Sequence, residues 1–383
     1  MKILLFANTE WYLYNFRLAL ARALQGAGAD VVLVSPAGPY GARLQEAGFR
    51  WIALPMERRS LNPLRELRLL LHLARLYRRE RPDVVHHFTI KSVVYGSLAA
   101  RLTSVERRIN AVAGMGYVFT SRAPRARMLR PFVRMLVRAA LGGAQTRLIL
   151  QNHDDLADFA QAGLIDPGRV RLIRGSGVNT DRFRPRNTPR QNDDVLRVLL
   201  AARLLWDKGI QEYVDAARQL KAEGLQIEFL LAGEPDLGNP AALPAATLQA
   251  WSTEGLITAL GHVDDMPSWL HRADLAVLPS YYREGVPKSL IEAAACGLPI
   301  IATDAPGCRE IVAHGVNGLL VPCRDARALA AAIRFMYENP SERIRMGAAG
   351  RAKALREFDE KLVLADTLAV YRELMPDALT TPL

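Results

Sequence analysis

Short apolar runs alternate with helical patterns along the chain, in two successive series, and this repetition limits the fold more than any other feature. The first series predicts strands at Lys2–Ala7, Val31–Ser35, Trp51–Leu54, Asp83–His87, Arg108–Val112 and Arg147–Gln151. The second predicts strands at Leu196–Ala201, Ile227–Ala232, Leu256–Leu260, Leu275–Pro279, Pro299–Ala302 and Gly318–Val321. Apolar strands separated by helices are typical of parallel sheets covered by helices. The sequence therefore predicts an α/β protein of two domains.

A polar stretch, Arg182–Asp194, contains two prolines and many charges, and it predicts an exposed linker between the two series. We therefore expect a first domain at residues 1–185 and a second at residues 195–355. Helical patterns include Tyr14–Gln25 and Leu64–Arg79 in the first domain. Two more, near Ser341–Glu357 and Glu360–Leu374, close the chain, and we expect the helix within residues 356–383 to pack back across the domains.

The composition excludes several classes of protein. No run of 18 or more apolar residues is present, so no membrane-spanning helix is expected. The first ten residues lack the features of a signal peptide. The three cysteines, Cys296, Cys308 and Cys323, have no paired ligand spacing, which favours a reducing compartment and no structural zinc. We therefore predict a cytoplasmic protein.

Positive charge is concentrated in the first half of the chain. The formal charge is +11 overall, but residues 1–190 hold 31 Lys and Arg against 13 Asp and Glu, which is +18. Residues 191–383 hold 19 against 26, which is −7. This asymmetry predicts an anionic partner for the first half. Nucleic acid, an anionic membrane surface and a phosphorylated acceptor all fit it.

Arg203 and Lys208 flank a turn between a predicted strand and a predicted helix, in the segment Ala202–Gly209. Such a turn presents backbone N–H groups and the positive end of a helix dipole. The two cations can pair with a diphosphate, the arginine through its planar fork and the lysine as a point charge. The alternative is that both are solvated surface cations.

Two glutamates follow in the segment Pro279–Pro299. Glu284 precedes a Gly-Val-Pro turn, and Glu292 lies within the helix that Pro287 begins and Gly297 ends. The N–H groups of Lys288 and Ser289 can face a phosphate there, and Glu292 can accept two ribose hydroxyls. Alternatively, Glu284 only complements the helix dipole.

Together these residues resemble the motifs of family 4 glycosyltransferases, which have the GT-B fold of two Rossmann-like domains facing each other across a cleft. Glu284 and Glu292 match the E-x7-E motif of that family, and Arg203 and Lys208 match its R-x4-K pair. Flanking phrases agree at Leu231–Glu234, Leu260–Val263, Ala273–Ser280 and Asn317–Pro322. The resemblance is dense from Val195 to Val321.

The resemblance implies that the second domain binds a nucleotide-sugar donor, which is a substrate and not a cofactor. Arg203 and Lys208 would hold its diphosphate, Glu292 its ribose and Glu284 the transferred sugar. The other implied donor contacts are Val286, Lys288, Ser289, Leu290, His262 and Val263. The chain lacks an Asp-x-Asp pair, so we expect no metal and no cofactor. The family retains anomeric configuration, and because no residue is a clear nucleophile we favour front-side attack.

The candidate residues of the first domain lie at predicted strand ends, where open α/β sheets bind ligands. They are His86, His87 and Lys91 at the carboxyl end of one strand, Asn8, Trp11, Asn15 and Arg17 after another, and Gly116 in a third turn. We predict that His87 takes part in catalysis and that the others bind the acceptor. A neutral histidine bonded to backbone, and a Trp11 that only packs, are the alternatives.

The segments His86–Lys91 and Gly114–Phe119 resemble a bacterial subgroup that builds surface polysaccharides on polyprenyl diphosphate carriers. This resemblance implies transfer of a hexose or N-acetylhexosamine from a UDP-sugar to a lipid-linked sugar. A nucleotide-sugar 2-epimerase of the same architecture remains an alternative. So does a nucleic-acid-binding protein, although no reading motif accompanies the positive charge, and we expect no nucleic acid partner.

Residues 122–138 form a basic amphipathic pattern. At 100° per residue, Arg127, Arg130, Arg134 and Arg138 cluster on one side, and Met128, Leu129, Phe132, Val133, Met135 and Leu136 occupy the other. Such a helix can lie on an anionic membrane. Alternatively its apolar side faces the sheet, and both hold if that side is only partly buried. We therefore predict a peripheral protein at the inner face of the cell membrane.

Overall fold

The computed structural model describes residues 1–58, 60, 62–112, 124–186, 195–236 and 238–376. The chain forms two compact units, a first unit of Met1–Ser176 with Leu362–Leu383 and a second unit of Gly177–Lys361. The first division falls at Gly177, before the boundary that we predicted at residue 185. The second falls at Leu362, beyond the predicted boundary at residue 356.

In the described part of the first unit, seven parallel strands form one sheet in the order β3-β2-β1-β4-β5-β6-β7. Their bounds are β1 Lys2–Phe6, β2 Asp30–Ser35, β3 Arg50–Ala53, β4 Val84–Phe88, β5 Arg107–Val112, β6 Thr146–Leu150 and β7 Val170–Leu172. The sequence predicted the first six within one or two residues. It missed β7, because this strand has only three residues, all of them half-buried at a sheet edge.

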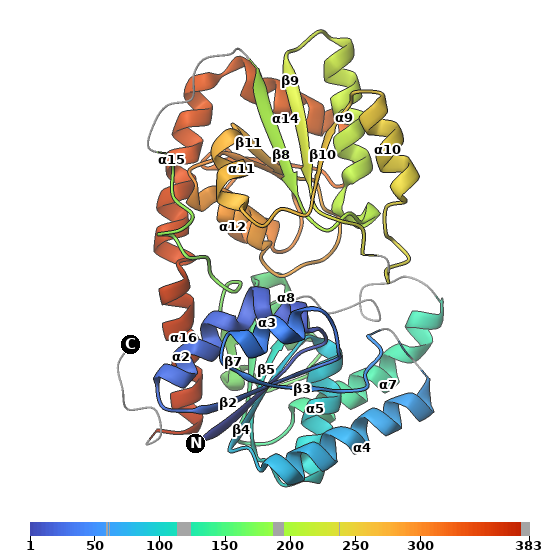
Figure 1. Cartoon of the computed structure of the whole chain (residues 1–383), viewed down its shortest axis with the longest axis vertical. Helices are drawn as coiled ribbons and strands as arrows, with labels where there is room; N and C mark the ends of the chain where they lie inside the picture. The colour runs from blue at the N-terminus through green and yellow to red at the C-terminus, as the bar shows by residue number, and fades with distance from the viewer. Residues whose placement is uncertain (59, 61, 113–123, 187–194, 237, 377–383) are drawn as a thin grey trace. The chain divides into compact units, whose positions relative to one another are not determined.

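Helices cover both faces of this sheet (Figure 1). In β1, Ile3 and Leu5 pack into one core and Leu4 and Phe6 into another, because successive side chains point to opposite faces. On the first face, α2 (Leu18–Gly26) lies beside α16 (Glu360–Leu374), although the two are far apart in the sequence. The second face carries α4 (Pro63–Glu80), α5 (Ile90–Leu102), α7 (Pro124–Leu141) and α8 (His153–Gln161).

The predicted helix Tyr14–Gln25 is more complex than its pattern indicated. It begins earlier, with α1 (Glu10–Tyr12), and a short π-helical turn, η1 (Leu13–Arg17), precedes α2. The Thr9 side chain caps α1 by accepting from the Tyr12 N–H at 3.1 Å. The remaining short elements of this unit are α3 (Tyr40–Glu46) and η2 (Pro167–Arg169).

In the described part of the second unit, six parallel strands follow the order β10-β9-β8-β11-β12-β13. Their bounds are β8 Leu196–Ala201, β9 Ile227–Ala232, β10 Thr258–Gly261, β11 Leu275–Leu278, β12 Ile300–Thr303 and β13 Gly318–Val321. The helical elements are η3 Trp206–Lys208, α9 Ile210–Ala222, α10 Ala245–Thr253, α11 Met266–Arg272, α12 Lys288–Ala295, α13 Cys308–Ile311, α14 Ala326–Glu338 and α15 Pro340–Glu357. Two parallel sheets with helices confirm the predicted fold class, in which each unit is Rossmann-like.

Candidate functional site

The residues predicted to bind the donor come together at the carboxyl edge of the second sheet. Arg203 and Lys208 follow β8, Glu284 follows β11, and His262 follows β10. Strands β10, β9, β8, β11 and β12 are consecutive neighbours, so the loops after them share one edge. Ligands of open α/β sheets bind at this edge.

Backbone contacts join the loop of Lys208 to the loop of Glu284. The carbonyl of Asp207 accepts hydrogen bonds from the N–H groups of Tyr281 and Tyr282, at 3.1 and 3.2 Å. Gly209, with φ +74°, allows a close approach, because a Cβ there would lie 2.1 Å from the carbonyl oxygen of Pro279. The two motifs, whose residues Lys208 and Glu284 are 76 positions apart, are therefore one structural feature.

Lys208 and Glu284 form an ion pair in this feature. The lysine Nζ lies 2.5 Å from the Glu284 Oε2, and Lys208 is only 6% exposed. The hydroxyl of Ser280 donates to the other carboxylate oxygen, Oε1, at 2.9 Å. The Lys208 ammonium and the Glu284 carboxylate, which have little access to water, neutralise each other. Ser280 belongs to the Ala273–Ser280 segment that resembles the family, but its role in orienting Glu284 was not predicted.

Arg203 is also paired with a carboxylate. Its Nη1 donates to the Oδ2 of Asp236 at 2.8 Å, and the arginine side chain remains 42% exposed. Asp236 follows β9. At Gly233, just after this strand, the backbone lies so close to the end of β8 that an added Cβ would lie 1.9 Å from the Ala202 carbonyl oxygen. Asp236 was not predicted as a site residue, although it lies only two residues beyond the Leu231–Glu234 segment that resembles the family.

Glu292 lies within α12, and burial raises the pKa of its carboxyl group to about 6, against the opposite effect of Lys288 and Arg182. Pro287 is the N-cap of this helix, and Gly297 follows its end with φ +76°, as predicted. The first turn contains Lys288, Ser289 and Leu290, and the preceding Val286 is buried. The N–H groups of this first turn of α12 form the positive end of the helix dipole.

His262 and Val263 follow β10 at the same edge. The ring Nε2 of His262 lies 3.3 Å from the Oδ1 of Asp264, and its side chain is 48% exposed. Val263 is partly buried against the core that also contains Leu290. The edge thus offers cations, a half-exposed ring and a helix N-terminus within one unit.

At the edge of the first sheet, Arg17 is held among aromatic rings. Its Nη2 donates to the Tyr12 hydroxyl at 2.8 Å, and its guanidinium carbon lies 4.5 Å from the centre of the Phe88 ring. Arg17 is 7% exposed, and its Nε has no hydrogen-bond partner among the described residues. Asn15 donates from Nδ2 to the carbonyl of Trp11 at 3.0 Å. Asn8 and Trp11 are half-buried next to it.

The two histidines of β4 do not reach this edge as predicted. Both are 0% exposed. His87 Nδ1 donates to the Asn110 Oδ1 at 2.9 Å, and Nε2 accepts from the Tyr77 hydroxyl at 3.0 Å. Burial lowers its pKa to about 4. Both nitrogens are thus engaged inside the core in this conformation, and a catalytic contact by His87 stays a prediction that would require this ring to change its partners.

His86 is enclosed on the opposite face of β4. Its Nδ1 lies 2.8 Å from the hydroxyl of Tyr371, which α16 contributes. Burial, together with the positive charge of Arg17, holds the pKa of His86 well below its usual range. The ring of His86 is thus a neutral part of the core in this conformation, and its contact with the acceptor stays a prediction.

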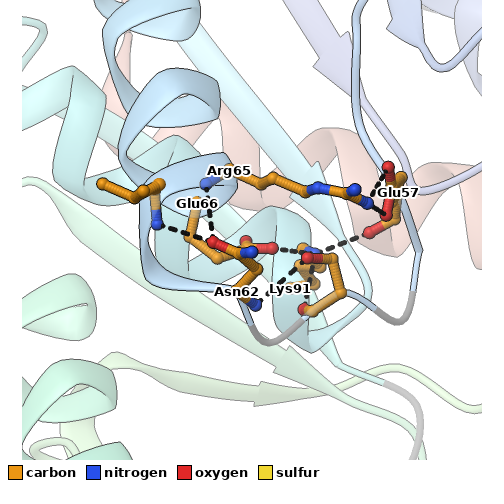
Figure 2. A network of polar contacts seen from close by, with 7 residues as sticks. Glu57, Asn62, Arg65, Glu66 and Lys91 are labelled. Atoms are coloured by element: carbon orange, nitrogen blue, oxygen red, sulfur yellow. Dashed lines mark hydrogen bonds and ion pairs between the residues drawn. The ribbon is translucent and has the colours of Figure 1, made fainter.

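Lys91 is engaged in a different contact from the one predicted, as Figure 2 shows. Its Nζ donates to the carbonyls of Glu57 and Ser60, at 2.6 and 3.2 Å, and lies 2.8 Å from the Glu66 Oε1. It therefore joins the start of α4 to the start of α5 and is not available as an acceptor ligand in this conformation. Gly116 lies outside the described residues.

Each half of the chain matches a known family of proteins. Residues 2–152 match the family described as Glycosyl transferase 4-like, and residues 196–339 match Glycosyl transferases group 1. The two matches together cover most of the chain. The chain is a glycosyltransferase. It belongs to the family that its motifs resembled, and that prediction is confirmed.

Several bacterial enzymes are similar to this glycosyltransferase over most of their length. The N,N'-diacetylbacillosaminyl-diphospho-undecaprenol alpha-1,3-N-acetylgalactosaminyltransferase of Campylobacter jejuni is 27% identical over 381 residues, which cover 97% of this chain and 98% of that enzyme. The UDP-Gal:alpha-D-GlcNAc-diphosphoundecaprenol alpha-1,3-galactosyltransferase of Escherichia coli is 24% identical, covering 77% of each chain.

Solved structures of glycosyltransferases have the same fold. HepE of Anabaena, in complex with UDP, has a TM-score of 0.76 at 20% identity and covers 97% of this chain and 100% of that one. A sucrose-phosphate synthase from Thermosynechococcus elongatus also has a TM-score of 0.76 at 20% identity, covering 98% of this chain and 100% of that one. The glycosyltransferase therefore has the GT-B fold that we predicted.

The described residues of the glycosyltransferase include no helix with the length and hydropathy needed to cross a membrane. Within the same residues, no group of three or more His, Cys, Asp or Glu side chains is placed to hold a metal ion. Cys296 and Cys308 are buried, and burial raises the pKa of each thiol to about 12. They are therefore protonated and unreactive at neutral pH.

Proposed function

We propose that this glycosyltransferase moves a hexose or N-acetylhexosamine from a UDP-sugar to a polyprenyl-diphosphate-linked sugar, with retention of configuration and without a metal ion. The observation that supports this most is the arrangement of Arg203 and Lys208 beside carboxylates at one sheet edge. Relatives of similar length are named for acceptors with a diphospho-undecaprenol carrier. These names favour a transferase over a nucleotide-sugar 2-epimerase.

Donor binding would exchange the partners of the two cations. The diphosphate would replace Asp236 at Arg203 and Glu284 at Lys208, since a phosphate carries more charge than one carboxylate and accepts more hydrogen bonds. Glu284, released but still oriented by Ser280, would then accept hydrogen bonds from hydroxyls of the transferred sugar. Glu292 would bind the ribose, with the base near His262 and Val263.

In the chemical step, the bond between the anomeric carbon and the β-phosphate oxygen breaks. The acceptor hydroxyl attacks on the same face, so the new glycosidic bond retains the configuration. The proton of that hydroxyl passes to the leaving phosphate oxygen and ends on UDP. Lys208, Arg203 and the first N–H groups of α12 would stabilise the negative charge on the leaving group, which replaces the role of a metal.

The acceptor would bind at the carboxyl edge of the first sheet. Arg17 is the cation suited to the acceptor diphosphate there, because it is stacked on Phe88 and its Nε has no partner in the part of the chain that the structure describes. Trp11 and Asn8 would contact the acceptor sugar, a ring face and a polar side chain being the usual partners of a saccharide. We also propose that the enzyme is attached peripherally to the inner face of the cell membrane, where such carriers would be used.

The direct test is a screen of UDP-hexoses and UDP-N-acetylhexosamines with a short-chain prenyl-diphosphate sugar as the acceptor. With EDTA present, mass spectrometry should detect the acceptor extended by one sugar. NMR of this product should show that the new glycosidic bond has the same anomeric configuration as the donor. Conversion of the donor to its 2-epimer without an acceptor would identify an epimerase instead. Inversion of configuration, or a requirement for Mn²⁺, would overturn the corresponding part of the proposal. Binding to duplex or single strands at physiological salt would support the nucleic-acid alternative.

A further inference from the structure

Large apolar side chains are exposed on two helices of the first unit. On α7, Met128 is 81% exposed, and Phe132 and Met135 are 56% and 57% exposed. On α4, the exposed residues are Leu64, Leu67 and Leu71, at 68%, 53% and 43%. Both helices pack against α5, which lies between them and is mostly buried (Figure 1). Exposed apolar residues gathered in this way mark a binding surface.

The apolar side of α7 is divided between two environments. Val133 and Leu136 are partly buried in the core under the helix, whereas Phe132 and Met135 face outward. The interpretation that the apolar side faces the core therefore holds for Val133 and Leu136, and the exposed residues leave the membrane interpretation as a prediction. The side chains of Arg127 and Leu129 lie outside what the structure describes.

Five of the six exposed side chains lie in the N-terminal halves of their helices, and Met135 lies just past the middle of α7. Helix α4 ends at Glu80, shortly before β4 begins at Val84, and α7 ends at Leu141, shortly before β6 begins at Thr146. The C-terminal ends of both helices are thus at the amino edge of the parallel sheet, and their N-terminal ends are at its carboxyl edge. The five in N-terminal halves, Leu64, Leu67, Leu71, Met128 and Phe132, are therefore toward the carboxyl edge of the sheet, the edge at which Trp11 and Arg17 follow β1.

Arginines accompany these apolar residues. A groove of about 630 Å³ runs along α7 and is lined by Arg130, Pro131, Arg134, Met135, Arg138 and Ala162. Helix α4 adds five exposed arginines, Arg65, Arg68, Arg75, Arg78 and Arg79. Cations beside large apolar side chains complement a surface with phosphates above an apolar layer.

The start of α4 is held firmly in place. Asn62 caps the helix by accepting from the N–H of Leu64 at 3.0 Å, and Lys91 of α5 binds Glu66 in its first turn. Arg65 pairs with Glu57 in the same network (Figure 2). Leu64 and Leu67 are therefore presented by a fixed helix, so little conformational entropy is lost when they bind.

We propose that the exposed faces of α4 and α7 form one docking surface for an anionic lipid bilayer. The six apolar side chains enter the acyl layer, and the arginines of the groove and of α4 contact lipid phosphates. Because this surface is at the carboxyl edge of the first sheet, a polyprenyl chain can stay in the bilayer while its diphosphate reaches Arg17. Only this last point rests on the proposed function, since the docking itself needs no acceptor.

The test is co-sedimentation of the full chain with vesicles of phosphatidylcholine alone or mixed with phosphatidylglycerol. The wild type should bind the anionic vesicles and be released as salt rises. The triple variant R130Q/R134Q/R138Q should lower the partition coefficient about a hundredfold, from about fivefold for each arginine near an anionic surface. A matched variant, R22Q/R218Q/R356Q, removes the same charge from exposed arginines outside the surface and should change binding little. Equal losses in the two triple variants would overturn the proposal, since net charge alone would then explain binding.

A second variant, L67S/F132S/M135S, tests the apolar part of the surface. It should weaken binding to both kinds of vesicle while circular dichroism and the melting temperature stay close to those of the wild type. Sedimentation velocity should find a monomer at micromolar concentration. A wild-type dimer that this variant dissociates, without vesicle binding, would show that a second copy covers the surface and would overturn the proposal. Sugar transfer to a short water-soluble acceptor should survive in all three variants, and its absence in the wild type would contradict the proposed function while leaving the docking result unaffected.

Discussion

The ammonium group of Lys208 lies 2.5 Å from the carboxylate of Glu284, although the two residues were predicted to contact different parts of the donor. Lys208 ends η3 after β8, and Glu284 follows β11, so the pair joins the loops of adjacent strands. Each side chain neutralises the other in a place with little water. In the proposed mechanism, the carboxylate occupies the position at Lys208 that a donor phosphate would take. Donor binding and the release of Glu284 toward the sugar would then be one event.

The first prediction concerns Lys208. Lys208→Ala should lower the turnover of sugar transfer at least about a hundredfold, because a buried cation at the leaving group acts mainly in the transition state. EDTA should leave the wild-type rate unchanged. Steady-state kinetics with and without EDTA measures both. Near-normal turnover in the variant, or a wild-type rate that EDTA abolishes and Mn²⁺ restores, would contradict the proposed clamp.

The second prediction separates the two glutamates. Glu292→Ala should weaken the binding of UDP itself, since the ribose changes little during the reaction. Glu284→Ala should keep or improve the affinity for UDP, because Lys208 loses a competing carboxylate, but it should lower kcat. Isothermal titration calorimetry with UDP and steady-state kinetics give the two quantities. If UDP affinity falls with Glu284→Ala and not with Glu292→Ala, the two roles are exchanged.

The third prediction follows from the raised pKa of Glu292, which is about 6 because of burial. Only the ionised carboxylate accepts two ribose hydroxyls, and at this pKa its ionised fraction rises about tenfold between pH 5 and pH 7. The affinity for a UDP-hexose should therefore increase about tenfold over that range. Glu292→Gln should bind more weakly and show little dependence on pH. A wild-type affinity that is equally independent of pH would exclude this carboxylate as the ribose ligand.

The donor site could be predicted from the sequence because short, local motifs carry it. A strand, a turn and a helix N-terminus place Arg203 and Glu284 at a sheet edge wherever such a unit folds. Asp236 was not predicted as the partner of Arg203, since their pairing depends on β9 and β8 being neighbours, which the sequence does not show. Ser280 was not predicted as the partner of Glu284, because their contact depends on the conformation of the loop after β11. Local motifs can be predicted from the sequence, whereas contacts between loops of different strands depend on the order of the strands in the sheet.

The first unit was harder to predict for the same physical reason. His86 and His87 are consecutive residues of a strand, so they point to opposite faces, and each has a buried partner from another element, Tyr371 of α16 for His86 and Tyr77 of α4 for His87. Tyr371 reaches His86 across 285 positions of sequence, a contact that no local pattern indicates. Strand membership was predicted correctly for both, whereas their burial required the packing of α4 and α16.

The fourth prediction concerns Gly307, which follows β12 with φ +81°. A Cβ there would lie 1.9 Å from the carbonyl oxygen of Gly285 and 2.9 Å from that of Glu284. Gly307→Ala should therefore displace the backbone that carries Glu284 and lower kcat at least about tenfold. Gly315→Ala is the matched control, because φ is +74° there and no atom lies within 4 Å of the added Cβ.

Both alanine variants at these glycines should lose about 1–2 kcal/mol of stability from the left-handed backbone, visible as a lower melting temperature. Only Gly307→Ala should also lose activity. Equal kcat values in the two variants would show that the Glu284 loop adjusts without cost to catalysis. In that case the close approach at Gly307 would matter for folding alone.

The fifth prediction concerns the pH dependence of stability that buried His87 causes. Its folded-state pKa is about 4, below the ordinary value of 6.5, because burial disfavours the charged ring. As the pH falls below 6.5, the unfolded chain binds a proton that the folded chain does not, so stability is lost between pH 6.5 and pH 4. From pH 7 to pH 5 this histidine should lower the free energy of unfolding by about 2 kcal/mol. His86, whose pKa is also lowered, acts in the same direction.

Urea unfolding at pH 7 and pH 5 measures this loss of stability. The loss in the free energy of unfolding should be smaller by about this amount in His87→Gln than in the wild type. His72→Gln replaces an exposed histidine of α4 and should leave the wild-type loss unchanged. If His87→Gln retains the full loss, His87 is protonated in the folded protein, and the neutral ring between Tyr77 and Asn110 is not its state in solution.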